Sequence, residues 1–510
     1  MTLALKTSAS RSYTHLIGGA WTAGEGGTID RFSPASGLLT GTCASATVED
    51  TDHAVAVARQ AFDRGEWSSR PASERGRILL KWAELLRANQ ETLAQIEAAE
   101  VGKPIRMARG DIQGAADLTE YAGALALDIH GEAYDHINGD DLGVVLREPI
   151  GVVAAIVPWN FPALIYSQKV PFALAAGCAV VVKPTEMTPS TAFEMSKLAF
   201  EAGVPGEVLN VITGEGSIVG GRLAVHHDVD MVSFTGSTAI GRQIAAAPSA
   251  NHKRLSFELG GKGATIVFDD ANLEDALDGV LFGVFLNQGE TCCAGSRLLV
   301  QDAIADEFLQ RLSERASRLK VGDVFADSTD IGAMINARHM AKVLEYIDGG
   351  LQGGATLLTG GSRVNVPGHE GGFFVAPTIL DHVKPTLKIF QEEIFGPVLV
   401  VTRFSTIEDA IRLANDTVYG LGNGVWTKNV DRAIRLGRAL RSGTVWVNTA
   451  NDGAPQLPFG GYKESGTGRE KGRGGLDEFL VSKTFHIHVG DRIPYFRAAT
   501  VRSRRTQRDD

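Results

Sequence analysis

The sequence predicts an α/β protein built from two α/β blocks. Three observations support this fold class. The chain has 510 residues, which is too long for one hydrophobic core. Short β-branched runs alternate with helix-like stretches after Pro149. Glycine, which suits tight turns between strands and helices, occurs 59 times. Continuous apolar strands joined by helices are typical of parallel sheets that are covered on both faces.

A long amphipathic helix is expected before the first block, over residues 73–100. Gly102 and Pro104 would end it. Apolar side chains recur there at helical spacing, at Leu79, Trp82, Leu86 and Leu93.

The first block has the pattern of a nucleotide-binding topology, although topology alone does not establish a function. Its strand-like runs cover residues 151–157, 179–182, 207–212, 231–234 and 264–268. The helix-like stretches between them lie near 163–176, 189–203, 216–226 and 238–247.

The second block continues the alternation to the end of the chain. Its expected strands are 297–301, 374–380, 397–404 and 443–448. Its expected helices are 273–287, 303–319, 338–350, 406–415 and 430–440. No repeat or low-complexity linker separates the blocks, so we expect a cleft between them, where small-molecule sites are common.

Composition excludes several classes of protein. The net charge of −10 argues against general nucleic-acid binding. The basic residues near the C-terminus (Arg502, Arg504, Arg505 and Arg508) are expected to be a solvated tail. No apolar run is long enough to span a membrane, and the N-terminus lacks a signal pattern. Four cysteines cannot form a disulfide framework, which favours a reducing, cytoplasmic compartment.

The segment NQGETCCAGSR (287–297) places two thiols directly after an apolar helix. A thiolate attacks carbonyl carbon readily, and nearby backbone N–H groups lower the pKa of such a thiol. For an isolated cysteine, an inert core position would be the commoner explanation.

Two further segments suggest a base and an oxyanion donor. In FELGGKG (257–263), Glu258 lies in an apolar setting that should raise its pKa and suit a general base. In VPWNFP (157–162), Asn160 follows a buried strand between two prolines, where its amide could stabilise an oxyanion. Taken alone, the first would more often be a solvated loop residue and the second a turn residue.

Together with QEEIFGPV (391–398), these segments resemble the aldehyde dehydrogenase superfamily in order and spacing. Cys292 follows Glu258 by 34 positions, similar to the interval in those enzymes. The resemblance extends from LIGGAW (16–21) to GYKESGTGRE (461–470). It implies oxidation of an aldehyde to a carboxylic acid through a cysteine thioester.

By motif position, the resemblance assigns Cys292 as nucleophile, Glu258 as base and Asn160 as oxyanion donor with the Cys292 N–H. It implies that Lys169 and Glu470 relay the proton of the base. No metal site is expected.

The resemblance also implies a bound NAD. Lys183 and Glu186 would hold the adenosine ribose, and the Glu186 carboxylate would repel the 2′-phosphate of NADP. Glu393 and Phe395 would hold the nicotinamide ribose and ring. The remaining implied cofactor residues are Trp159, Gly216, Gly236, Ser237, Gly241 and Leu259.

Three rival functions remain. A coenzyme A-acylating dehydrogenase would use the same thiol, but such relatives usually lack the glutamate found at position 258. A cysteine hydrolase would need a histidine partner, and none of these motifs contains one. A binding or structural homologue would have lost catalysis while keeping the fold.

The substrate tunnel is implied by motif position alone. Relatives with tight apolar tunnels often carry aromatic residues where this chain has Gln168 and Gly453, so a wider or more polar tunnel is expected. Residues 110–113 do not reproduce the acidic pair of typical aminoaldehyde enzymes. The other implied tunnel residues are Phe161, Ile165, Thr291, Cys293 and Phe459.

The implied architecture is a Rossmann-like NAD-binding domain, an α/β catalytic domain and a small β arm for oligomerisation. The expected boundaries are 1–123 with 144–258, 259–476, and 124–143 with 477–495, followed by a tail at 496–510. The resemblance implies a homodimer or homotetramer, and an edge strand such as 479–489 needs a partner to avoid an exposed hydrogen-bonding edge.

Overall fold

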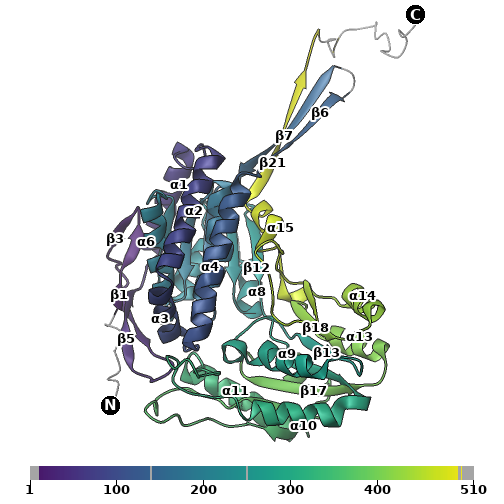
Figure 1. Cartoon of the computed structure of the whole chain (residues 1–510). Helices are drawn as coiled ribbons and strands as arrows, with labels where there is room; N and C mark the ends of the chain where they lie inside the picture. Colours follow the sequence, from purple (N-terminus) through teal and green to yellow (C-terminus); the bar gives the residue numbers. More distant parts are fainter. Residues whose placement is uncertain (1–10, 138–139, 248–250, 492–495, 497–510) are drawn as a thin grey trace, which may run out of the picture.

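The computed structural model describes residues 11–137, 140–247, 251–491 and 496. Two large sheets, each with helices on both faces, form the body of the molecule (Figure 1). A narrow three-stranded arm projects from the body (Figure 1). The predicted α/β fold class is therefore confirmed.

The first sheet has eight strands, and its central strands are parallel as predicted. Alternate residues of its strand β8 face opposite cores: Val153 and Ala155 face one, and Ala154 and Ile156 face the other. In spatial order the strands are β20 (Gly466–Thr467), β12 (Arg254–Glu258), β11 (Met231–Thr235), β8 (Val152–Val157), β9 (Ala179–Pro184), β10 (Leu209–Val211), β2 (His15–Ile17) and β3 (Ala20–Thr22).

Helices cover both faces of this sheet, because its strands are apolar on both sides. The helical segments are α1 (Val48–Arg64), α2 (Ala72–Ala88), α3 (Gln90–Val101), α4 (Ile105–Ala126), α5 (Pro162–Ala176), α6 (Ser190–Ala202), η1 (Gly216–Gly220), α7 (Gly221–Val225) and α8 (Thr238–Ala246). The prediction of one helix over 73–100 is wrong, since α2 and α3 are separate. Asn89 breaks the helix, where its side-chain amide donates to the Leu85 carbonyl at 2.9 Å.

The second sheet has seven strands: β15 (Thr356–Thr359), β16 (Thr378–Asp381), β17 (Val398–Phe404), β14 (Arg297–Gln301), β13 (Ala264–Val267), β18 (Gly422–Trp426) and β19 (Thr444–Val447). Only β15 is antiparallel to its neighbour. The run 264–268, grouped with the first block in the sequence, belongs here instead. The turn Gly260–Gly263 carries the chain from β12 of one sheet to β13 of the other. The apolar run of β13 looks like those of the first block, so the sequence alone does not show that the chain has changed sheets.

The second sheet is likewise covered on both faces. Ile266 and Val400 pack toward one core, whereas Val267 and Val401 pack toward the other. The helical segments are α9 (Leu273–Phe285), η2 (Leu286–Gly289), η3 (Asp302–Ile304), α10 (Ala305–Ala316), α11 (Ala337–Gln352), α12 (Lys388–Gln391), α13 (Ile407–Asn415) and α14 (Val430–Ala439).

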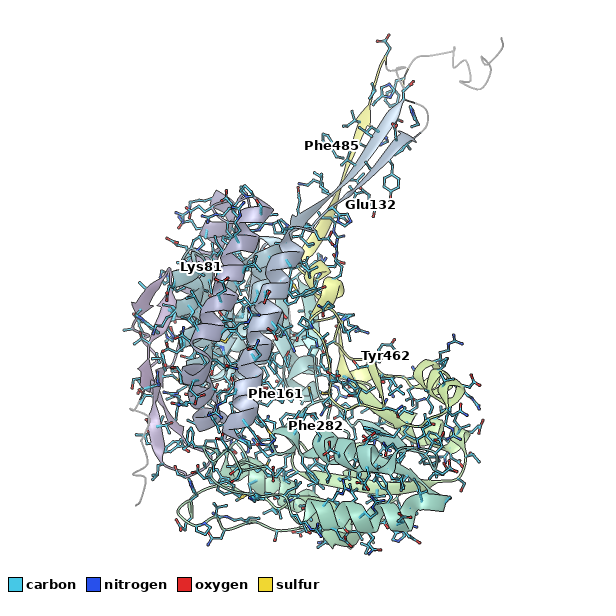
Figure 2. The ribbon with its side chains drawn as sticks, viewed as in Figure 1. Lys81, Glu132, Phe161, Phe282, Tyr462 and Phe485 are labelled. Carbon is cyan, nitrogen blue, oxygen red and sulfur yellow. The ribbon has the colours of Figure 1, made fainter. Side chains whose placement is uncertain are left out.

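The projecting arm consists of β6 (Glu132–Ile137), β7 (Asp141–Pro149) and β21 (Leu480–His488). β21 pairs antiparallel with β7 along its whole length, so the predicted strand 479–489 is present. Figure 2 shows Glu132 and Phe485 on the arm, clear of the body, and Phe485 is 56% exposed. A further small sheet contains β1 (Arg11–Tyr13), β5 (Leu39–Ala44) and β4 (Thr28–Phe32), and the last short helices are η4 (Lys463–Ser465) and α15 (Gly472–Asp477).

Among the described residues, none of the helices combines the length and apolar character needed to cross a membrane. All four cysteines are unbridged. The basic tail predicted from Arg502 to Arg508 lies outside the described residues.

Candidate active site

The carboxyl ends of three parallel strands bring the predicted catalytic segments to one edge of the first sheet. β8 leads into Pro158–Asn160, β11 leads into Gly236 and Ser237, and β12 ends at Glu258 itself. Crevices at this edge are the usual ligand sites of open α/β sheets. A cavity of about 190 Å³ lies here and is lined by Pro158, Trp159, Asn160, Thr235, Gly236, Ser237, Glu258, Leu259, Gly260, Cys292, His339, Lys342, Glu393 and Phe395.

The loop that carries Cys292 has an unusual backbone. After α9, Asn287 and Gln288 have φ values of 51° and 48°, in the left-handed region that non-glycine residues seldom adopt. Glu290, fully buried, holds this loop: its carboxylate accepts from the Ile335 N–H and from the Gln288 amide, both at 2.9 Å. The strained turn fixes the direction in which Cys292 enters the cavity.

The Cys292 thiol is not predisposed to ionise. Its pKa is raised by the interaction with the Cys293 thiol, by burial, and by the carboxylates of Glu393 and Glu258. The expectation that backbone N–H groups lower this pKa is therefore wrong for the structure without ligands. The carboxylates near the thiol, which come from two other segments, disfavour a second negative charge, so little thiolate forms without a base.

Glu258 has the environment of a general base. Its side chain is 4% exposed, and neither carboxylate oxygen has a hydrogen-bond partner within the described part of the chain. Burial raises its pKa well above the ordinary value, and the nearby Glu470 raises it further. Lys169 opposes that shift. An unpartnered buried carboxylate is costly, and such groups are common where chemistry takes place.

Asn160 is buried beside the nucleophile loop. Its amide nitrogen donates to the Glu290 carbonyl at 2.9 Å, and the Asn287 amide donates to the Asn160 carbonyl at 2.9 Å. The first bond holds the Asn160 side chain and the second holds its backbone, and within the described residues the second N–H of the side-chain amide has no partner.

Lys169 and Glu470 form a buried ion pair near Glu258. The Lys169 ammonium also donates to the Ser233 hydroxyl at 2.9 Å, and Thr235 donates to the Glu470 carboxylate at 3.3 Å. The pair lies behind Glu258, and Glu470 does not line the cavity.

The predicted ribose pair is formed, outside the lining of this cavity. The Lys183 ammonium is buried and lies 3.5 Å from the Glu186 carboxylate. Gly216 opens the short helix η1, where an added Cβ would meet nothing within 4 Å. Gly241 is needed for packing, because a Cβ there would lie 2.6 Å from Leu259.

Aromatic rings form one wall of the cavity. Trp159 lies edge-on to Phe395, with ring centroids 5.3 Å apart, and Phe395 has a left-handed φ of 61°. The Glu393 carboxylate accepts from the Gly261 N–H at 2.9 Å, and burial raises its pKa to about 7.

His339 and Lys342 complete this wall, although no motif in the sequence indicated either residue. They are on α11, which none of the recognised motifs includes. The His339 ring lies 5.6 Å from Trp159 and its Nε2 contacts the Phe395 carbonyl at 2.7 Å. Burial lowers its pKa to about 4, so the ring is neutral and engaged with backbone rather than poised as a partner for the thiol.

The predicted tunnel residues divide into a buried and an exposed set. Ile165 and Thr291 are buried at 6% each, whereas Gly453 is exposed. The Phe161 ring (labelled in Figure 2) stacks on the Lys103 ammonium at 4.2 Å. Cys293 faces a second, smaller cavity, where its sulfur lies 3.6 Å from the side-chain Oδ1 of Asn451. Gln168 and Phe459 are half-buried.

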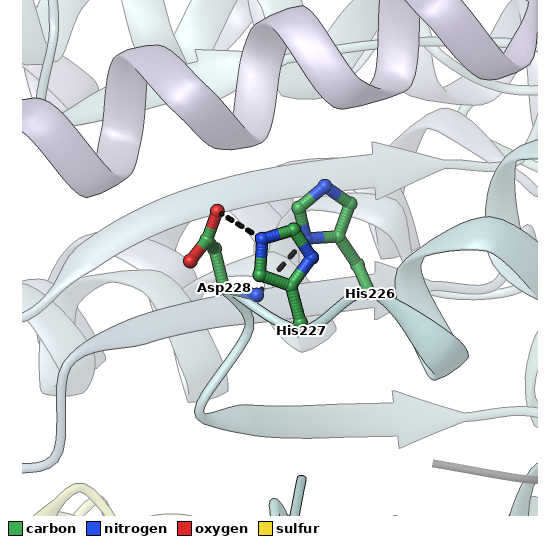
Figure 3. Close-up of side chains that lie close together, drawn as sticks. All are labelled: His226, His227 and Asp228. Carbon is green, nitrogen blue, oxygen red and sulfur yellow. Dashed lines mark hydrogen bonds and ion pairs between the residues drawn. The ribbon is translucent and has the colours of Figure 1, made fainter. Parts of the chain in front are cut away.

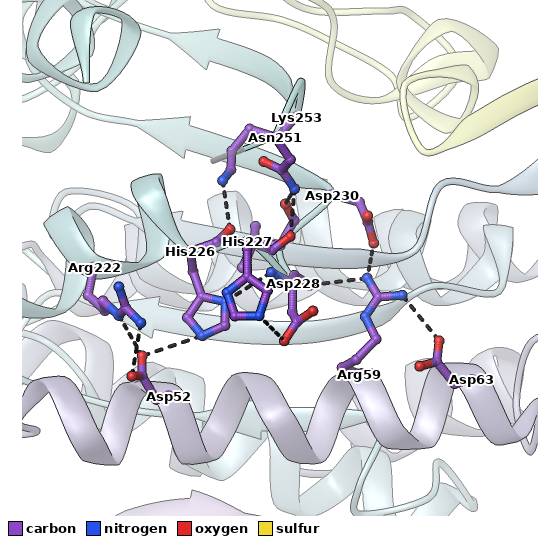
Figure 4. A network of polar contacts seen from close by, with 11 residues as sticks. Asp52, Arg59, Asp63, Arg222, His226, His227, Asp228, Asp230, Asn251 and Lys253 are labelled. Atoms are coloured by element: carbon purple, nitrogen blue, oxygen red, sulfur yellow. Dashed lines mark hydrogen bonds and ion pairs between the residues drawn. The ribbon is translucent and has the colours of Figure 1, made fainter. Parts of the chain in front are cut away.

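A polar cluster at the other end of the sheet is the one group in the described chain that could hold a metal ion. His226, His227 and Asp228 lie together before β11 (Figure 3). His226 Nδ1 accepts from the Asp228 N–H at 3.0 Å, and His226 Nε2 lies 3.4 Å from Asp52. Figure 4 shows these residues joined to Arg222 and to α1. Both nitrogens of His226 are engaged by protein groups, so we assign the cluster to loop structure.

Comparison with known proteins gives one consistent result. The sequence model of the aldehyde dehydrogenase family matches residues 21–485. The betaine aldehyde dehydrogenase of Bacillus subtilis (strain 168) is 45% identical over 478 residues, which cover 94% of this chain and 97% of the relative.

Solved structures agree with that match. An NAD-dependent aldehyde dehydrogenase from Sinorhizobium meliloti has a TM-score of 0.95 at 45% identity, covering 97% of this chain and 98% of the other. A betaine aldehyde dehydrogenase from Staphylococcus aureus, solved with NAD+, has a TM-score of 0.93 at 37% identity, covering 96% and 97%.

Proposed function

The chain belongs to the aldehyde dehydrogenase family, and from that premise we propose that it oxidises an aldehyde to the carboxylic acid through a thioester on Cys292. The observation that supports this most strongly is the cavity shared by Cys292, Glu258 and Asn160. A thiol, an unpartnered carboxylate and an amide donor meet there, as covalent acyl chemistry requires.

NAD is the cofactor, and the residues present fit it. The Lys183–Glu186 pair offers an ammonium and a carboxylate to ribose hydroxyls. Gly236 and Ser237 line the cavity at the start of α8, where backbone N–H groups suit a pyrophosphate. When bound, NAD accepts the hydride that leaves the substrate carbon.

In the acylation half of the reaction, the Cys292 proton has to leave first, because the thiolate is the nucleophile and the raised pKa of this thiol leaves little of it ionised. Glu258, whose carboxylate oxygens are free, accepts it. The thiolate then attacks the aldehyde carbon to form a thiohemiacetal, and the free N–H of the Asn160 amide stabilises its oxyanion. Collapse of that oxyanion expels hydride and leaves a thioester.

In the deacylation half, Glu258 removes a proton from water, which attacks the thioester carbon and releases the acid and the thiol. The raised pKa of Glu258 makes it a stronger base than an ordinary carboxylate. Lys169 and Glu470 lie where they would pass the proton onward from the base.

The test compares the two neighbouring cysteines. In an assay of NADH formation from NAD and an aldehyde, Cys292→Ala should abolish turnover while leaving NAD binding and the fold intact. Cys293→Ala, the matched control, should retain substantial turnover. The opposite phenotypes would overturn the assignment of the nucleophile. If coenzyme A increased the rate of NADH formation and no free carboxylic acid appeared, the enzyme would be an acylating dehydrogenase instead.

We also propose that the arm mediates assembly into a homodimer or homotetramer. Support comes from β21, an edge strand on a projecting sheet with the apolar Phe485 exposed. Phe485→Glu should lower the mass measured by light scattering, and an unchanged mass would contradict this role.

A further inference from the structure

A lysine that none of the motifs includes lies among the predicted tunnel residues. The Lys471 ammonium lies 5.6 Å from the centroid of the Phe459 ring. A Cβ added to Gly453 would be 3.1 Å from the same ammonium nitrogen. The pKa of Cys293 is lowered mainly by the hydrogen bond with the Cys292 thiol, and the Lys471 charge lowers it further. Phe459 and Gly453, which the sequence places in the substrate tunnel, therefore lie next to this cation, and its charge acts on a third such residue, Cys293.

Gly453 is the reason that the ammonium has room. A side chain at position 453 would begin within 3.1 Å of the Lys471 nitrogen, so a larger residue there would displace it. The sequence predicted a wider or more polar tunnel from the absence of an aromatic residue at this position. The space is in fact occupied by a positive charge.

The strained backbone of Lys471 fixes the direction of its side chain. Its φ of 59° and ψ of 176° lie in a region that is nearly exclusive to glycine. Both flanks are anchored: Glu470 pairs with Phe459 through two backbone hydrogen bonds of 2.7 Å, and the Gly472 N–H donates to the Pro455 carbonyl at 2.9 Å. A lysine kept at such a position, where glycine would be unstrained, points to a use for its ammonium.

The ammonium has no partner of opposite charge. Within the described residues Lys471 forms no hydrogen bond through its side chain and no ion pair, although Glu470 and Asp452 are near enough to raise its pKa. Glu470 is already paired with Lys169. Burial has the larger effect and lowers the pKa of Lys471.

Lys103 shows what a purely structural lysine looks like in the same region. It too stacks on a tunnel aromatic, Phe161, but it is fully buried and paired with Glu97 at 3.0 Å and with Asp111. Its charge is neutralised by the protein. The charge of Lys471, in contrast, is not neutralised by an ion pair within the described residues, so it is available to bind an anionic ligand.

We propose that Lys471 binds an anionic group at the far end of the substrate, so that the enzyme acts on aldehydes that also carry a carboxylate. This inference rests on the proposed dehydrogenase function and names its substrate class. A positive charge among the tunnel residues disfavours a cationic aldehyde such as the one named for the Bacillus subtilis and Staphylococcus aureus relatives.

The test uses pairs of aldehydes that differ only in terminal charge. Succinic, glutaric and adipic semialdehydes are compared with butanal, pentanal and hexanal, and betaine aldehyde is the cationic probe. In the wild-type enzyme, kcat/KM should be about tenfold or more higher for at least one semialdehyde than for its matched alkanal. Betaine aldehyde should be the poorest substrate.

Lys471→Met should lower kcat/KM for the preferred semialdehyde by about ten- to a hundredfold, the size of one lost charged hydrogen bond. The loss should fall mainly on KM, because the contact is made equally in the ground state and in the transition state. Turnover of the alkanals should stay close to wild type. Lys471→Arg should keep most of the preference, and Lys81→Met, on the distant helix α2, should change nothing.

Lys471→Gly is the second variant, in case Lys471→Met fails to fold. Glycine relieves the strained backbone and also removes the charge. Equal losses for semialdehydes and alkanals would show that Lys471 acts through the thiols, which overturns the proposal. A wild-type preference for betaine aldehyde would overturn it as well. Absence of turnover with every aldehyde would instead refute the proposed function.

Discussion

The two ends of strands β11 and β12 differ in how their polar groups are satisfied. At the amino end, Arg222 binds the Asp52 carboxylate with two hydrogen bonds, of 2.5 and 2.9 Å, and Arg59 binds Asp230 (Figure 4). At the carboxyl end, both oxygens of the buried Glu258 lack hydrogen-bond partners within the described residues, whereas at the amino end Arg59 Nε lacks one but the charge of Arg59 is paired with Asp230. An unpaired buried carboxylate lowers stability, and such groups are common where chemistry takes place.

The first way to sharpen this comparison is to remove a donor at the carboxyl end. Asn160→Ala should lower kcat by roughly 10²–10³, because the oxyanion of the thiohemiacetal loses a fixed amide donor. KM for the aldehyde should change little, since the donor acts on charge that develops in the transition state. Steady-state kinetics, with thermal unfolding as the check on folding, measures this. A loss below about threefold would remove Asn160 from the oxyanion site.

A smaller effect is expected at the cofactor pair. Glu186→Ser removes the carboxylate that repels a 2′-phosphate. The preference for NAD over NADP, expressed as the free-energy difference that corresponds to the ratio of the two kcat/KM values, should fall by about 1–3 kcal/mol. Both cofactors are titrated at saturating aldehyde. Glu215→Ser, on a neighbouring exposed loop, is the charge-matched control. A wild-type enzyme that prefers NADP would refute this assignment.

The smallest effect is expected at the amino end. Asp52→Asn weakens a partly exposed ion pair with Arg222, which should cost no more than about 1 kcal/mol of unfolding free energy. kcat should be unchanged, because no catalytic segment touches this network. Urea unfolding and steady-state kinetics on the same preparation test both statements. A fall in kcat without a fall in stability would contradict the contrast between the two ends.

The sequence predicted the alternating strands and the catalytic segments because each is a local pattern. It missed β12, where Arg254, Ser256 and Glu258 interrupt the apolar run. A period of two was present there and could have revealed the strand. It also missed α4, whose three glycines lower its helix propensity, although tertiary packing against α2 and α5 stabilises it.

Other parts of the site could not be predicted from local patterns. His339 reaches the cavity because α11 of the second sheet packs against Trp159 of the first. Lys471 reaches the tunnel because Glu470 pairs with Phe459, a contact that only the folded chain creates. The pKa of Cys292 is raised by the Cys293 thiol, by burial and by carboxylates from two other segments, and the last two causes exist only in the folded chain, so the direction was mispredicted.

The central claim is that Glu258 resolves a thioester on Cys292, and Glu258→Gln tests it most directly. The amide keeps the shape of the side chain but cannot accept a proton. The variant should give a burst of NADH that approaches the concentration of active sites and then stall, with the acyl group found by mass spectrometry on the peptide containing Cys292. Because Glu258 also accepts the Cys292 proton in the proposed mechanism, this burst should be slow at neutral pH and faster at higher pH, where the thiolate forms unaided.

In the wild-type enzyme, the rate of turnover should change with pH in a direction that follows from the pKa of Glu258. Because the pKa of Glu258 is raised, turnover should fall with decreasing pH already well above the range in which an ordinary carboxylate takes up a proton. The variant should lack this limb. Steady-state turnover at the wild-type rate in Glu258→Gln, with no acyl adduct on Cys292, would contradict the account.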